Sequence, residues 1–88
     1  MPVIKLYASL RKLAGTRELF LPGETIAAVL RELENQTPSL NGVLLEAGAL
    51  RPHVLLTLNG HTTTEIDTQV TEQDVLAIFP PIAGGTSM

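Results

Sequence analysis

The chain has 88 residues, of which 44% are hydrophobic and 17% charged, so we expect one small domain with a single core. Its formal net charge of −3 and its lack of a basic run argue against nucleic acid as a partner. The absence of cysteine excludes disulfides, thiolate nucleophiles and cysteine metal sites. No apolar run approaches the roughly 20 residues of a membrane span, and the sequence does not open on a signal peptide, so we expect a cytoplasmic protein with no membrane partner.

The first half of the sequence predicts a hairpin followed by a helix. Val3–Ala8 is rich in β-forming residues, and Arg17–Leu21 reads as a returning strand after the turn signal Gly15-Thr16. Thr25 is the expected N-cap of the main helix, whose apolar stripe recurs at helical spacing. The stripe consists of Ile26, Val29, Leu30 and Leu33.

A shorter second helix is expected after the main one. Asn35–Pro38 ends the main helix, and Ser39 is placed to cap a segment that carries Leu40, Val43 and Leu44. Gly42 weakens this prediction because glycine disfavours a helix interior.

The second half predicts three strands. Val54–Leu58 is expected to be a central strand, and Asn59-Gly60 is a hairpin turn signal. Leu55 and Leu58 belong either to the core, which we favour for both, or to a hydrophobic face beside Phe79. A short strand within His61–Gln69 and a turn at Thr71–Asp74 then lead to the last strand. On that strand, Val75–Phe79, alternation places Leu76 and Ile78 on the core side and Val75, Ala77 and Phe79 on the other.

These elements are typical of a small α+β domain. If the first and last strands are parallel neighbours at the sheet centre, one helix can cover one face. The result is a β-grasp, or ubiquitin-like, fold: a mixed sheet of four to five strands packed on one main helix plus a short helix. We expect this domain to span residues 1–81, with a flexible tail at 82–88.

The polar residues do not assemble a catalytic or metal site. His53 and His61 are the only histidines, and no convergent set of three or four zinc ligands is evident, so we expect no bound metal. Asp67, Glu72 and Asp74 lack a calcium-loop pattern and read as turn carboxylates. No nucleophile–base pair or phosphate-binding loop stands out, so we expect a protein that is not an enzyme.

Three cations, Arg11, Lys12 and Arg17, cluster around the first loop. They form either a solvated loop or a docking patch for an acidic partner, and the sequence does not decide between the two.

The end of the chain is its most specific feature. The segment Val75–Gly85 ends in Phe-Pro-Pro-Ile-Ala-Gly-Gly, and together with Leu6–Gly15 and Leu58–Gly60 it resembles the MoaD/ThiS family of ubiquitin-like sulfur carriers. The chain departs from the family at Glu72-Gln73-Asp74, where an Asp-Gly-Asp turn is usual. It departs again where Thr86-Ser87-Met88 follows the second glycine.

The resemblance implies a chemistry in which the carrier is a co-substrate. An adenylyltransferase related to ubiquitin-activating enzymes would adenylate the carboxylate of Gly85 with MgATP. A sulfurtransferase or other persulfide donor would then replace AMP and leave a thiocarboxylate for a downstream synthase. The protein itself would bind no cofactor, and it could also serve as the small subunit of a heteromeric synthase.

The same resemblance assigns roles to the tail. Gly84 and Gly85 lack Cβ atoms and would enter a narrow channel, while the stiff segment Pro80-Pro81 and the following Ile82-Ala83 would insert with them. Phe79 and Tyr7 would contribute to the partner-binding face.

The three-residue cap sets a condition, because an amide at Gly85 cannot be adenylated. The Gly85–Thr86 bond must first be cleaved, and the resemblance implies a JAMM-type zinc metalloprotease as the partner that does so. The alternatives are an unprocessed, inactive member or a tail that is an artefact of the sequence.

The recipient of the sulfur stays open between molybdopterin, thiamin, cysteine, homocysteine and siderophore-type pathways. Two rival functions also stay open. One is a protein modifier joined through Gly85 to lysines, and the other is a β-grasp binding module for which the tail is dispensable.

Overall fold

The computed structural model of the protein describes residues 1–80. Its elements, in chain order, are β1 (Val3–Leu6), α1 (Ser9–Ala14), β2 (Glu18–Phe20), α2 (Ile26–Gln36), the 3₁₀ helix η1 (Pro38–Leu40), β3 (Leu45–Glu46), β4 (Ala49–Leu50), β5 (Leu55–Leu58), β6 (His61–Thr63) and β7 (Val75–Phe79). Five strands form one sheet in the order β2-β1-β7-β5-β6, and β3 and β4 form a separate hairpin. β1 and β7 are parallel neighbours, while the other pairs in the main sheet are antiparallel. This topology confirms the predicted β-grasp fold.

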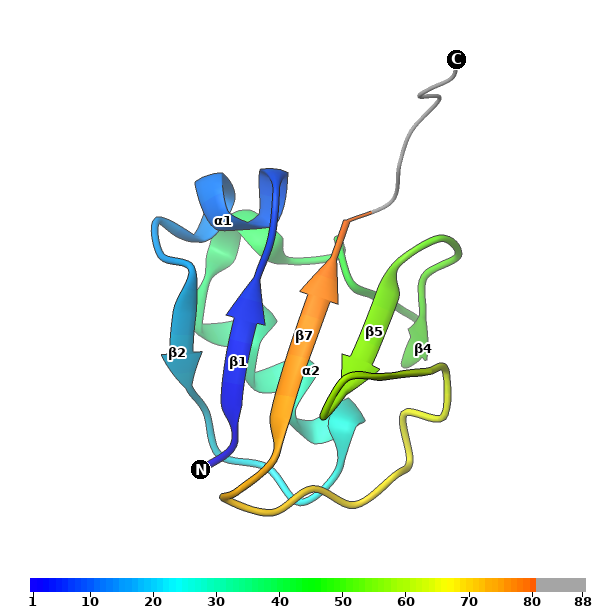
Figure 1. The fold of residues 1–88 in the computed structure, drawn as a ribbon. Coiled ribbons are helices and arrows are strands. Elements are labelled where there is room, and N and C mark those ends of the chain that lie inside the picture. The colour runs from blue at the N-terminus through cyan, green and yellow to red at the C-terminus, as the bar shows by residue number, and fades with distance from the viewer. Residues whose placement is uncertain (81–88) are drawn as a thin grey trace.

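Helix α2 covers one face of the sheet (Figure 1). Its predicted apolar stripe is fully buried, and Thr25 caps it by accepting a hydrogen bond from the Ala28 backbone N–H at 3.1 Å. Opposite α2, the sheet contributes Ile4, Leu6, Leu56, Leu76 and Ile78 to the same core. The other face of the main sheet carries no helix within residues 1–80 (Figure 1).

The loop of the first hairpin contains a helix that the sequence did not predict. The first strand ends at Leu6 rather than Ala8, because Ala8 adopts a positive φ of 54° and turns the chain into α1. Leu10 anchors α1 by full burial. Gly15, at φ 75°, ends the helix in the left-handed conformation that glycine tolerates best. Helix α1 therefore lies at the end of the sheet where β7 also ends (Figure 1).

The predicted short helix from Ser39 to Leu44 was wrong. The chain instead forms only η1, and Ser39 donates its hydroxyl to the Leu13 carbonyl at 2.6 Å rather than capping a helix. The backbone N–H groups of Leu44 and Leu45 donate to one carboxylate oxygen of Glu34, at 2.9 and 3.0 Å. A side chain on α2 thus satisfies the donors that a second helix would have used internally.

The β5–β6 turn is as predicted. Asn59 and Gly60 both have positive φ, 53° and 86°, which is the backbone that a two-residue hairpin turn requires. β5 pairs with β7 on one side and β6 on the other, so it is an interior strand as expected.

The side chain of Asn59 also ties this turn to the segment that precedes β7. Its amide donates to Asp74 Oδ1 at 2.9 Å and its Oδ1 accepts from the Val75 N–H at 2.9 Å. Asp74 Oδ2 in turn accepts from the Thr71 N–H at 2.7 Å. The hydrogen bond from Asn59, and then that from Thr71, hold the pKa of the Asp74 carboxyl below its ordinary value.

Replacing Asp74 by asparagine is therefore expected to destabilise the fold in a pH-dependent way. Because the folded-state pKa is lowered, the contribution of the carboxylate is fully present above its unfolded-state pKa and is lost as pH falls through the folded-state pKa. The difference in urea midpoint between Asp74→Asn and the natural chain should be largest near pH 7 and should shrink as pH falls below the ordinary carboxyl pKa of about 3.9. Glu72→Gln is the control, since Glu72 lies exposed in the same turn. A difference that is constant across this range would contradict the prediction.

Candidate functional site: the end of β7 and the open sheet face

The strand that carries the tail ends beside an aromatic pair. Phe79 is the last residue of β7, and its ring stacks on Tyr7 with centroids 4.5 Å apart and planes 11° apart. The Tyr7 N–H donates to the Ile78 carbonyl at 3.3 Å, which extends the parallel pairing one residue beyond β1. Both predicted partner-face residues therefore lie together, half-buried, where β7 ends at Pro80.

The alternation predicted for β7 is confirmed. Leu76 and Ile78 are fully buried under α2, whereas Val75 and Phe79 are only partly covered. Ala77 is also buried, at 8% exposure, because this small side chain lies between Lys5 on β1 and Thr57 on β5.

Leu55 belongs to the open face beside Phe79, so the favoured core position was wrong and the alternative is confirmed. It lies opposite Phe79 in the β5–β7 register, and paired residues point to the same face of a sheet. Its exposure is 44%, and it extends the apolar surface formed by Tyr7 and Phe79. Leu58, on the other side of the strand, packs against the core as expected. We refer to Tyr7, Leu55 and Phe79 as the apolar cluster.

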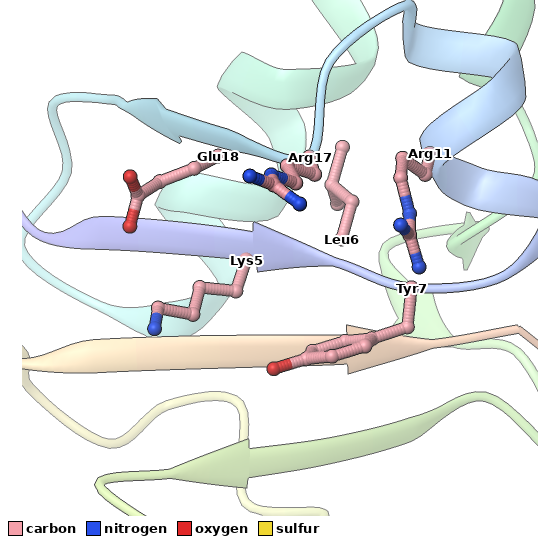
Figure 2. A pocket seen from close by; sticks show the side chains of 6 residues that line it. All are labelled: Lys5, Leu6, Tyr7, Arg11, Arg17 and Glu18. Atoms are coloured by element: carbon pink, nitrogen blue, oxygen red, sulfur yellow. The ribbon is translucent and has the colours of Figure 1, made fainter.

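Cations border this cluster on the side of β1. Lys5, Leu6, Tyr7, Arg11, Arg17 and Glu18 line an open hollow of about 370 Å³. Figure 2 shows the side chains of Arg11 from α1, Arg17 from the loop before β2 and Lys5 from β1 on the same side of the sheet as the Tyr7 ring. Two of the three cations that the sequence grouped thus meet beside a predicted partner-face residue, while Lys12 is exposed on α1.

The remaining polar candidates lie elsewhere. His53, at a positive φ of 72°, and His61, the first residue of β6, are both exposed. Asp74 is held in the turn described above, and Asp67 and Glu72 are exposed. Within residues 1–80, no three or more histidine and carboxylate side chains gather closely enough to hold a metal ion.

The residues predicted to carry the chemistry lie outside the described part of the chain. They are Pro81, Ile82, Ala83, Gly84, Gly85 and Thr86. Pro80, the first residue of the predicted inserting segment, is described, and it follows Phe79 directly.

Sequence reasoning missed one further exposed aromatic residue. Phe20 on β2 is 61% exposed and lies opposite Val3, on the same open face but toward the start of β1. The alternation of side chains along β2 could have predicted this exposure. Leu19 packs against the core, so its neighbours Glu18 and Phe20 point to the opposite face of the sheet.

The sequence profile of the ThiS family matches residues 4–85, which is nearly the whole chain. The chain belongs to the ThiS family. This finding agrees with the resemblance to ubiquitin-like sulfur carriers of the MoaD/ThiS type, and the match ends at the second glycine of the tail.

Two curated relatives of this ThiS-family protein carry different descriptions. Small archaeal modifier protein 3 of Haloferax volcanii is 32% identical over 88 residues, covering 93% of this chain and 96% of the relative. The molybdopterin synthase sulfur carrier subunit of Arabidopsis thaliana is 39% identical over 85 residues, covering 93% and 80%. One relative is thus named for protein modification and the other for sulfur transfer.

A solved structure supports the fold independently. The solution structure of small archaeal modifier protein 1 from Methanosarcina acetivorans superposes with a TM-score of 0.84 at 33% identity, covering 94% of each chain. Among residues 1–80 of the ThiS-family chain, the longest helix is α2 with 11 residues, and none is long and apolar enough to traverse a bilayer.

Proposed function

We propose that this protein is a sulfur carrier whose reactive group is the carboxyl of Gly85, exposed by cleavage of the Gly85–Thr86 bond. The supporting observation is the placement of the strand end. β7 ends at Phe79, a member of the apolar cluster, and Pro80 follows it directly, so a partner bound to the cluster would lie where the tail begins. The family match extends through Gly85 and leaves Thr86–Met88 beyond it.

The proposed chemistry needs activation because a carboxylate is a poor electrophile at neutral pH. An adenylyltransferase would join the Gly85 carboxylate to AMP from MgATP and release pyrophosphate. A persulfide from a sulfurtransferase would attack the acyl carbon and expel AMP. A thiol would then reduce the resulting acyl disulfide, which releases the thiocarboxylate and forms a disulfide on the donor. The carrier contributes a positioned acyl group, and a cytoplasmic location would supply the ATP.

Two further partners belong to this proposal. A JAMM-type zinc protease would remove Thr86–Met88 before activation, and a downstream synthase would consume the thiocarboxylate. A carrier of this kind would act as a co-substrate, or as the small subunit of a heteromeric synthase, in a pathway such as molybdopterin, thiamin or cysteine synthesis.

Protein modification is the second candidate, and the 32% identity to a small archaeal modifier protein favours it specifically. Both functions share the adenylated Gly85 and differ in the nucleophile that follows, a persulfide in one case and a lysine amine in the other. High-mass conjugates in cells would indicate a modifier.

The intact mass of the protein isolated from its own cells tests the proposal. We expect a chain that ends at Gly85 with one oxygen replaced by sulfur. A full-length chain under every growth condition, with no processed fraction, would contradict processing and favour a binding module. Deleting Gly84 and Gly85 is the matched control, because a carrier or a modifier would lose function whereas a binding module would not.

A further inference from the structure

The cations of this protein are unevenly distributed along the chain. Four of its six lysine and arginine residues occur among the first 18 positions, where the only carboxylate is that of Glu18, which gives this segment a formal charge of +3. The other two cations and eight carboxylates give the rest of the chain a charge of −6. A protein with a net charge of −3 therefore carries one local positive region.

The fold concentrates this region beside the apolar cluster. Arg11 and Arg17 are exposed and Lys5 is half-buried, and all three line the hollow that Tyr7 borders (Figure 2). No ion pair joins these three side chains to a carboxylate within residues 1–80, where the one ion pair is Arg51–Glu46 at 3.9 Å. We refer to Lys5, Arg11 and Arg17 as the basic cluster.

Helix stabilisation accounts for only part of this arrangement. Arg11 and Lys12 lie in the last turn of α1, where cations interact favourably with the helix dipole. Lys5 and Arg17 lie outside any helix, yet they line the same hollow as Arg11. Glu18, the register partner of Lys5, lines the same hollow but forms no ion pair with any of the three cations. The hollow therefore keeps an excess of positive charge, which favours the approach of an anion.

We infer that the basic cluster docks an acidic segment of the protein partner that receives the tail, with an apolar side chain of that segment on the Tyr7–Phe79 pair. The inference rests on the proposed function, which supplies a partner that receives the tail. It adds the chemistry of that partner's binding segment, namely carboxylates beside an apolar side chain. Charge complementarity supports this occupant, because rim charges around an apolar contact steer association and fix its orientation. An extended nucleic acid is a poorer fit, because its phosphates would be repelled by the formal charge of −6 on the rest of the chain.

The test is a nuclear magnetic resonance titration of the full chain with a blocked hexapeptide, Glu-Glu-Leu-Glu-Glu-Leu. We expect amide shifts at Tyr7, Arg11 and Arg17 that weaken as salt is added. Arg11→Gln with Arg17→Gln should weaken peptide binding about tenfold, as expected for two exposed ion pairs. Arg31→Gln with Arg51→Gln removes the same charge from other parts of the chain and should leave the affinity within about twofold.

Three outcomes would overturn the inference. Equal weakening by the two double variants would show a response to net charge alone. Equal binding of a peptide with glutamine in place of glutamate would remove the role of the carboxylates. Displacement of the peptide by millimolar inorganic phosphate would indicate a small-anion site. The titration requires neither cleavage nor activation of the tail, so it can fail while the mass measurement succeeds, and the reverse also holds.

Discussion

Replacing Gly85 by leucine, in a chain that ends at that residue, is expected to slow acyl-adenylate formation about a hundredfold while leaving the fold intact. Position 85 lies six residues beyond Phe79, the last residue of β7, and the described core is built entirely from residues before it. If the tail enters a narrow channel to reach the nucleotide, a side chain there displaces the carboxylate from the attacking geometry. A displacement of this kind costs about a hundredfold in rate.

The measurement is ATP–pyrophosphate exchange with the activating enzyme, in the series Gly85, Gly85→Ala and Gly85→Leu. We expect a graded loss, with unchanged melting temperature in all three chains. Ala49→Leu adds bulk at an exposed position on β4 and should not alter the exchange. A chain that ends at Met88 should show no exchange, because the carboxyl group of Gly85 is then bound in an amide to Thr86. Normal exchange by the leucine variant would contradict a narrow channel.

Much of the fold could be predicted because its signals are local. Thr25 caps a helix whose apolar spacing lies in one window, and Asn59-Gly60 specifies a two-residue turn by backbone conformation alone. The alternation of β7 likewise identified which of its residues point away from α2. In each case, residues adjacent in sequence contain the information.

The remainder depends on contacts between distant segments. A six-residue helix such as α1 is unstable alone, and it forms because Leu10 enters a core built by other elements. The exposure of Leu55 follows from its register with Phe79, 24 positions away, which no local pattern specifies.

The candidate site likewise combines features predicted from local sequence with features that depend on contacts between distant segments. The chemistry of the tail was predicted from a contiguous motif. The stacking of Tyr7 on Phe79, and the meeting of Lys5 with Arg11 and Arg17, required the parallel pairing of the first and last strands and the folded first loop.

The adjacent residues Ile78 and Phe79 should respond to truncation in opposite ways. Ile78 is fully buried beneath α2, so Ile78→Ala should lower the free energy of unfolding by about 3–4 kcal/mol through lost burial and a residual cavity. For a domain of this size, that is a large share of the total stability. Phe79 is half-buried on the open face, so Phe79→Ala should cost about 1–2 kcal/mol, mostly the stacking on Tyr7.

Partner binding should show the reverse order. An aromatic side chain at the centre of an interface contributes about 2 kcal/mol or more, so Phe79→Ala should raise the KM for the carrier in the exchange reaction about thirtyfold with little change in kcat. Phe20→Ala is the matched control, since it removes an equally large and more exposed ring from the other end of the same face. If Phe20→Ala raised KM as much as Phe79→Ala, the partner would cover the whole open face. If Phe79→Ala instead matched Ile78→Ala in lost stability and left KM unchanged, the aromatic pair would serve the fold rather than the partner.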